Sequence, residues 1–206
     1  MMEFVTLSNG VKMPILGFGV YQTPPAETEK IVFQALETGY RLIDTAASYR
    51  NEEGVGAALA QSGIPREDLF ITTKVWVQDH GYDNTLKAFD VSMKKLGLDY
   101  LDLYLIHKPY GDYYGTWRAM ERLYKEGRIR AIGVTSFWNE RLGDLCVSNE
   151  CKPVINQIET NVWNQKWSEE EFMKELGVQP EAWSPFAEAN GNVFQQPLLK
   201  VIAENH

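Results

Sequence analysis

Short apolar runs alternate with amphipathic segments along almost the whole chain. The spacing of the apolar runs is typical of short buried strands, and the segments between them carry the 3.6-residue periodicity of helices. The runs begin near Leu16, Arg41, Phe70, Leu101, Ala131, Val154 and Glu181. Strands that alternate with helices in this way build a parallel sheet. The pattern therefore predicts a barrel, in which each strand and helix together take roughly 31 residues.

Turn and cap residues divide these segments. Asn9-Gly10 lies between two short extended runs and predicts a β-hairpin at the N-terminus. Ser168 with Glu171 predicts a capping box at the start of a late helix. The other expected helix boundaries are Pro24 and Gly39, Asn51 and Gly63, Gly97, Gly127 and Pro197.

The predicted fold is a (β/α)8 TIM barrel of the α/β class, truncated after about seven strand-helix units and preceded by the hairpin. One domain spanning residues 1–206 is expected, since no linker interrupts the pattern. A complete barrel of this type takes about 250 residues, so we expect the chain to end before an eighth strand. Open sheet edges favour association. We therefore expect a monomer for the complete barrel and self-association for the short chain.

Four side chains that can move or steer protons lie at or just beyond the ends of predicted strands. Asp44, Lys74 and His107 each close an apolar run, and Tyr49 follows Asp44 in the next loop. The C-terminal ends of parallel barrel strands gather at one rim. A single aspartate, lysine or histidine in such a place is more often structural, but four together indicate a shared active site.

These four residue types suit the reduction of a carbonyl group. A phenol is a reluctant acid at neutral pH, because its ordinary pKa is about 10, and the Lys74 ammonium would lower that value. Asp44 would hold Lys74 charged, and His107 would donate a hydrogen bond to the substrate oxygen. Tyr49 would then protonate the developing alkoxide. The hydride has to come from a nicotinamide cofactor.

Composition restricts the partners. The chain has 28 acidic and 20 basic residues and a net charge of -8, so neither nucleic acid nor an anionic membrane surface is an expected partner. We expect a cytoplasmic protein, because neither a signal peptide nor a long apolar segment is evident. Cys146 and Cys151 lack metal-knuckle spacing and are expected to be free thiols. No metal site is predicted.

The chain resembles the aldo-keto reductase family over nearly its whole length. Within the family it is similar to the bacterial reductases of the 2,5-diketo-gluconate reductase type. The motifs that carry the resemblance are Gly39-Tyr-Arg-Leu-Ile-Asp-Thr-Ala-Ala-Ser-Tyr49, Phe70-Ile-Thr-Thr-Lys74-Val-Trp76, Leu101-Asp-Leu-Tyr-Leu-Ile-His107 and Gly127-Arg-Ile-Arg-Ala-Ile-Gly-Val134.

The resemblance implies NADPH (NADP+) as the cofactor and the same four residues as the catalytic tetrad. It also implies that Gln157 binds the nicotinamide amide and that Trp183 stacks on its ring, while Trp76 joins Tyr49 and His107 in the substrate pocket. Further cofactor contacts implied in this way are Asp44, Thr135, Ser136, Ser184 and Phe186. Tyr21 and Trp117 are weaker pocket candidates, for which simple packing is an equally good interpretation.

The chain also departs from the family pattern. Ser136 stands where an asparagine usually helps to hold the nicotinamide amide, and Lys108 follows His107 where tryptophan or glutamine is common. Asn161-Val162 replaces a frequent His-Pro pair. The segment that, by the resemblance, grips the adenine half of the cofactor has no counterpart, so we expect the chain to bind NADPH weakly or not at all.

The function predicted from the sequence is NADPH-dependent reduction of an aldehyde or ketone to an alcohol by hydride transfer. An alternative is a non-catalytic barrel relative that acts as a binding or regulatory module. A third hypothesis is a barrel isomerase or aldolase that uses Lys74 as a Schiff base, which leaves Tyr49 and Gln157 unexplained. The sequence does not identify the carbonyl substrate, because the rim loops that select it vary freely.

Overall fold

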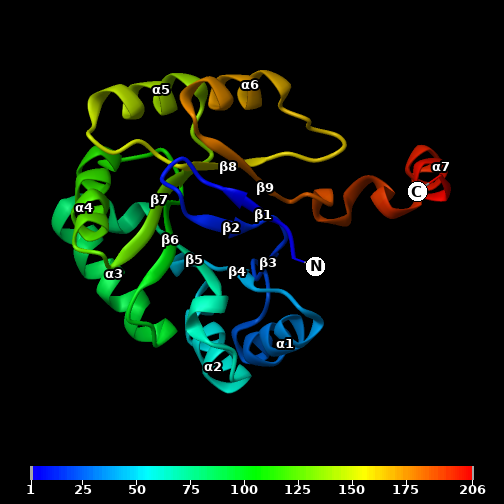
Figure 1. The fold of residues 1–206 in the computed structure, drawn as a ribbon, viewed down its shortest axis with the longest axis horizontal. Helices are drawn as coiled ribbons and strands as arrows, with labels where there is room; N and C mark the ends of the chain where they lie inside the picture. Colours follow the sequence, from blue (N-terminus) through cyan, green and yellow to red (C-terminus); the bar gives the residue numbers. More distant parts are fainter. Residues whose placement is uncertain (1, 206) are drawn as a thin grey trace.

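The computed structural model describes residues 2–205 and contains one long parallel sheet and a short hairpin (Figure 1). The hairpin pairs β1 (Phe4–Thr6) with β2 (Lys12–Pro14) in antiparallel fashion. The parallel sheet has seven strands in sequence order: β3 (Gly17–Gly19), β4 (Leu42–Asp44), β5 (Phe70–Val75), β6 (Leu101–Ile106), β7 (Ile129–Thr135), β8 (Ile155–Glu159) and β9 (Gln179–Trp183). The predicted hairpin and the seven predicted parallel strands are therefore confirmed.

The sheet is strongly curled. β4 and β8 lie four positions apart in the strand order, yet the Gln157 side-chain amide donates to the Asp44 carboxylate over 3.0 Å. Such a contact requires the strands to wrap around a shared interior, as in a barrel. Among the described residues, β3 and β9 pair on one side only and form the two edges of the sheet.

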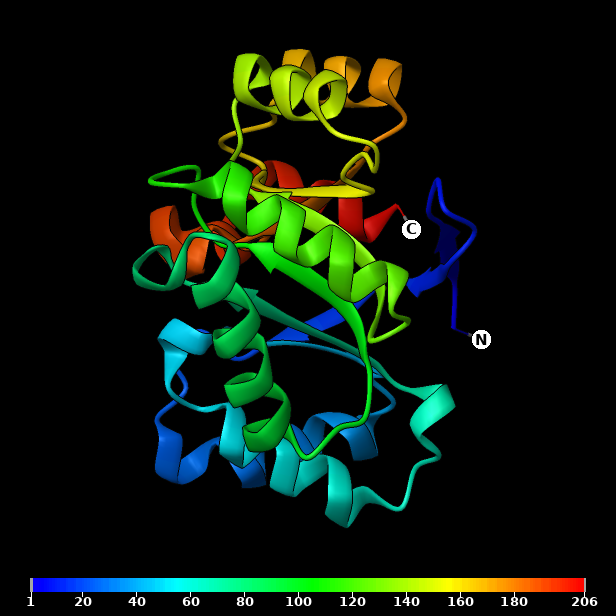
Figure 2. The same ribbon diagram turned by 90° about the vertical axis from the view of Figure 1, so that its left-hand side faces the viewer.

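Helices cover the outer face of the curl, as two views at right angles show (Figures 1 and 2). They are α1 (Pro25–Thr38), α2 (Glu52–Ser62), α3 (Tyr82–Leu96), α4 (Tyr113–Lys125), α5 (Asn139–Ser148) and α6 (Trp167–Leu176), while α7 (Pro197–Glu204) lies apart from the sheet. Gly39, Gly63 and Gly97 end their helices with positive φ, which glycine adopts without strain.

The predicted capping box at Ser168 is wrong. The N-cap lies two residues earlier, at Lys166, which is in the left-handed region and makes no side-chain cap, and α6 begins at Trp167. Ser168 therefore lies inside the first turn, and its hydroxyl donates to the neighbouring Glu169 carboxylate over 2.7 Å. Lys166 also pairs with Glu169 at 3.1 Å, within the first turn of the helix.

Two apolar clusters form the core. The larger lies between the sheet and the helices and includes Trp117, whose indole N–H donates to the Cys151 carbonyl over 3.1 Å. The smaller fills the inside of the curl, where Leu7 and Met13 of the hairpin pack against Leu103 and its neighbours. The hairpin therefore closes one end of the interior, and polar chemistry is left to the other end.

Gly56 permits close packing between α2 and α3. A Cβ atom on this residue would lie 2.6 Å from the Leu96 carbonyl oxygen and 2.7 Å from that of Lys95, both backbone atoms that cannot rotate away. We expect Gly56→Ala to lower the free energy of unfolding by about 1–3 kcal/mol, measured by urea denaturation. Gly19→Ala is the control, because a Cβ there would have no atom within 4 Å. Equal free energies of unfolding for the two variants would show that α2 and α3 can shift apart to accept the added methyl group without loss of stability.

Candidate active site

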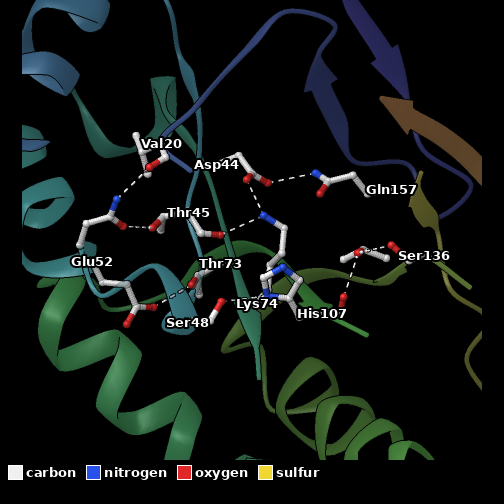
Figure 3. A network of polar contacts seen from close by, with 12 residues as sticks. Val20, Asp44, Thr45, Ser48, Glu52, Thr73, Lys74, His107, Ser136 and Gln157 are labelled. Atoms are coloured by element: carbon white, nitrogen blue, oxygen red, sulfur yellow. Dashed lines mark hydrogen bonds and ion pairs between the residues drawn. The ribbon is translucent and has the colours of Figure 1, made fainter. Parts of the chain in front are cut away.

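The four predicted proton-handling residues meet at one rim of the curled sheet. Figure 3 shows three of them, Asp44, Lys74 and His107, close together. Asp44 is the last residue of β4, and Lys74 is the next to last residue of β5. His107 directly follows β6, and Tyr49 ends the short helix η1 (Ala47–Tyr49). The structure therefore brings together residues that span more than sixty positions of sequence.

Lys74 lies at the centre of the cluster and is buried, with 1% of its surface exposed. Its ammonium pairs with the Asp44 carboxylate and donates to the Thr45 carbonyl over 3.1 Å. Burial acts to lower the pKa of Lys74, but Asp44 and Tyr49 more than offset it, and the pKa lies above its ordinary value. A Schiff-base lysine needs a neutral amine, so this environment argues against that hypothesis.

Tyr49 lies directly beside this ammonium. The Lys74 Nζ atom is 5.1 Å from the centre of the Tyr49 ring. Burial raises the pKa of Tyr49, and the Asp44 charge raises it further, while the Lys74 charge lowers it. The net result is a pKa above its ordinary value. The expected lowering is therefore not observed in the free protein, because the loss of solvent outweighs the nearby cation. The phenol stays protonated at neutral pH, as a proton donor must.

His107 is held between two aromatic rings. Its imidazole lies edge to face with Tyr49 and with Trp76, at centroid distances of 5.5 and 5.0 Å. The Ser48 hydroxyl lies 3.3 Å from its Nδ1 atom. Burial, followed by the charges of Lys74 and Lys108, lowers the pKa of His107 to about 3. His107 is therefore neutral at physiological pH and acts as a hydrogen-bonding group, with no charge of its own.

Asn51 fixes the loop that carries Tyr49. Its buried side chain accepts from the Thr45 hydroxyl over 2.8 Å and donates to the Val20 carbonyl over 2.9 Å. The next residue, Glu52, accepts from the Thr73 hydroxyl over 2.7 Å, beside Lys74 in β5. Sequence analysis did not identify these supporting residues; Asn51 was predicted only as a helix boundary.

Residues expected to contact the nicotinamide line the adjoining strand ends. Gln157 on β8 donates to Asp44, and no described residue donates to its amide oxygen. The Thr135 hydroxyl donates to the His107 carbonyl over 3.0 Å. The hydroxyl of the next residue, Ser136, accepts a hydrogen bond from the Lys108 ammonium. Trp183 ends β9 with a partly exposed indole. Together these residues offer an amide acceptor, a hydroxyl and an aromatic face, which fits a nicotinamide amide and ring.

Ser184 and Phe186 are placed differently from the other expected cofactor residues. The Ser184 backbone and side chain contact Asn161 and Glu188, and Ser184 has a positive φ of 50°. Phe186 is 62% exposed, and its ring packs at 5.5 Å from that of Phe194. The structure therefore does not bring Phe186 into the cluster.

A cavity of about 480 Å³ opens beside Tyr49. It is lined by Tyr21, Gln22, Thr23, Pro24, Pro25, Ser48, Tyr49 and Trp76. The pocket candidates Tyr21 and Trp76 therefore line one space with the phenol, whereas Trp117 is buried in the core. The lining is mostly aromatic and apolar and carries no charged side chain, which suits a small neutral molecule.

Glu181 is a further member of the cluster that sequence analysis did not assign a role. It lies on β9 opposite Gln157, and its Oε2 atom is inaccessible to water and has no hydrogen-bond partner among the described residues. Burial, with the nearby Asp44 charge, raises the pKa of Glu181 to about 8. Its position near a strand end was the only signal in the sequence that could have revealed it.

Metal-binding and membrane-spanning features were sought across residues 2–205. No group of three or more histidine, cysteine or acidic side chains is arranged to hold a metal ion in this range. None of its helices combines the length and the apolar character needed to cross a membrane. Cys146 and Cys151 are both free thiols, as expected.

Comparison with known proteins defines the class to which this fold and site belong. Residues 15–192 match the model of the aldo/keto reductase family, which covers most of the chain. Relatives and solved structures of the same family are similar over essentially all of it. The chain therefore belongs to the aldo/keto reductase family, and the resemblance of the motifs to this family is confirmed.

Individual relatives are similar over a large share of their own length. The chain is 48% identical to glyoxal reductase of Bacillus subtilis (strain 168) over 206 residues, covering 99% of the chain and 74% of that protein. It is 42% identical to methylglyoxal reductase DkgA of Escherichia coli (strain K12) over 205 residues, covering 98% of the chain and 74% of that protein.

Solved structures agree with the fold. The crystal structure of an aldo/keto reductase from Brucella melitensis superposes with a TM-score of 0.94 at 45% identity, over 100% of this chain and 80% of the other. The crystal structure of a Bombyx mori aldo-keto reductase in complex with NADP superposes with a TM-score of 0.91 at 35% identity, over 99% of this chain and 76% of the other.

Glu181 predicts a distinctive dependence of stability on pH. An unfolded glutamate has a pKa near 4.3, so the folded chain keeps this proton while the unfolded chain loses it as pH rises toward about 8. The free energy of unfolding should therefore fall across that window. In Glu181→Gln no proton is lost, and urea denaturation from pH 5 to 8 should show a smaller fall than in the wild type. Exposed Glu175→Gln makes the same charge change as a control. Parallel profiles for wild type and Glu181→Gln would mean that Glu181 is ionised when folded.

Proposed function

We propose that this chain carries the active site of an NADPH-dependent carbonyl reductase that converts aldehydes or ketones to alcohols. The observation that carries the proposal is the buried Lys74–Asp44 pair with Tyr49 and His107 beside it at one rim. An acid and a neutral hydrogen-bonding group next to an open cavity form the arrangement that protonation of a carbonyl oxygen needs.

The named relatives support a small carbonyl substrate. Two similar proteins are a glyoxal reductase and a methylglyoxal reductase, and a structural neighbour was solved in complex with NADP. The uncharged cavity beside Tyr49 suits a small neutral dicarbonyl of this kind. We therefore propose such dicarbonyls as the first substrates to test, with NADPH as the reductant.

Each residue has a role that follows from its surroundings. The cofactor, when bound, supplies the hydride. Tyr49 donates its phenolic proton to the substrate oxygen, and Lys74 stabilises the phenolate that this leaves. Asp44 holds Lys74 in place, and neutral His107 orients the carbonyl by a hydrogen bond. Gln157, Ser136 and Trp183 position the nicotinamide, and Trp76 with Tyr21 excludes water from the substrate.

The central test replaces the acid. We expect Tyr49→Phe to lower the rate of NADPH oxidation with methylglyoxal by about 10²- to 10⁴-fold, because the phenylalanine ring has no proton to give. Binding of NADPH, followed by quenching of tryptophan fluorescence, should be largely preserved. Tyr21→Phe is the matched control, since its ring lies 5.1 Å from that of Tyr49 in the same cavity.

Two outcomes would contradict the proposal. Near-normal turnover by Tyr49→Phe would remove this residue from the role of acid. A wild-type protein that binds NADPH but oxidises none of it with glyoxal, methylglyoxal or larger aldehydes would instead favour a non-catalytic binding role for the barrel.

Lys74 offers a second test through both pH and stability. In Lys74→Met the pKa of Tyr49 should rise, because the cation that stabilises the phenolate is lost. Asp44 would be left as an uncompensated charge, and the free energy of unfolding should fall by about 3–5 kcal/mol. The measurements are the pH dependence of kcat and urea denaturation. Exposed Lys94→Met is the control, and an unchanged pH profile in Lys74→Met would show that Lys74 is merely structural.

A further inference from the structure

Lys108 is a half-buried cation at the rim without a counter-charge. Its Nζ atom donates to the Ser136 hydroxyl over 3.3 Å and lies 5.7 Å from the centre of the Trp183 indole. It forms no ion pair with any residue in the part of the chain that the structure describes. Burial lowers the pKa of this ammonium below its ordinary value.

The position of this ammonium relative to its neighbours indicates what it faces. Lys108 extends from the end of β6 to Ser136 at the end of β7 and on toward Trp183 at the end of β9. An ammonium has three N–H donors, and only the Ser136 hydroxyl accepts one here. The remaining charge and donors are therefore available to a ligand held between Ser136 and Trp183.

We propose that Lys108 makes the site distinguish the two redox states of the nicotinamide, favouring the neutral reduced ring over the cationic oxidised ring. The inference rests on the proposed function, in which Ser136 and Gln157 hold the nicotinamide amide and Trp183 faces its ring. A hydrogen bond from Lys108 to the amide oxygen helps both states alike. Only the repulsion between the ammonium and the oxidised ring differs between them.

The size of the effect follows from Coulomb's law. Two unit charges about 6 Å apart repel enough to change an affinity roughly threefold in water and roughly a hundredfold at an effective dielectric constant of about 20. Lys108 is half-buried, so a discrimination on the order of tenfold is expected. The oxidised cofactor would then dissociate more readily than the reduced cofactor, which limits inhibition by this product.

The test compares the dissociation constants of NADPH and NADP+ for the purified protein by quenching of tryptophan fluorescence. The adenine half is identical in both molecules, so it cancels in the ratio of the two constants even where overall binding is weak. In Lys108→Gln the preference for NADPH should fall by on the order of tenfold. Lys108→Arg, which keeps the charge, should retain the preference. Lys94→Gln makes the same charge change on the exposed face of α3 and should leave the ratio unchanged.

The outcomes separate this inference from the proposed function. Binding of both forms with the same ratio in wild type and Lys108→Gln would overturn the inference alone. An unchanged ratio together with a raised KM only for a carboxylate-bearing carbonyl such as glyoxylate would also overturn it and would assign Lys108 to the substrate. A wild-type protein that binds neither form at millimolar concentration would contradict the cofactor site itself, and the inference with it.

Discussion

A buried ammonium is the constraint on which the rest of the site depends. Lys74 is almost fully enclosed, and an isolated charge in such a place would be strongly destabilising. Its carboxylate partner comes from the neighbouring strand, and that carboxylate is held in turn by Gln157 from the far side of the curl. The curl of the sheet therefore completes the hydrogen bonding of the pair that compensates this charge.

The same enclosure sets the protonation of the neighbours. Loss of solvent keeps His107 neutral and Tyr49 protonated, and it leaves Glu181 holding a proton near neutral pH. The Lys74–Asp44 ion pair thus lies among neutral donors and acceptors, with the Lys108 ammonium as a further charge at the rim. Groups of this kind have their hydrogen bonds ready before a substrate arrives, since no proton has to be rearranged first.

The sequence predicted those features that depend on local order. Strand starts, the Asn9-Gly10 turn and the glycine helix ends follow from periodicity and backbone preference, and the strand-end positions of Asp44, Lys74 and His107 were enough to predict their meeting. Ser168 was misassigned because α6 begins at Trp167 with Lys166 at the N-cap, which places the serine inside the first turn. Glu181 and the Asn51 contacts could not be predicted, because they depend on which atoms meet across the interior.

The hydrogen bond from Gln157 to Asp44 joins residues 113 positions apart, and this separation has a kinetic consequence. Contacts between distant parts of a chain form late, because a long loop must be closed first. During synthesis from the N-terminus, Asp44 and Lys74 leave the ribosome well before β8 exists. Until that strand docks, the Asp44 carboxylate lacks its hydrogen bond from Gln157, and the pair depends on the pairing of β4 with β5. The complete hydrogen-bond network of the site therefore forms only after β8 has docked, and a partly synthesised chain that lacks β8 does not contain it.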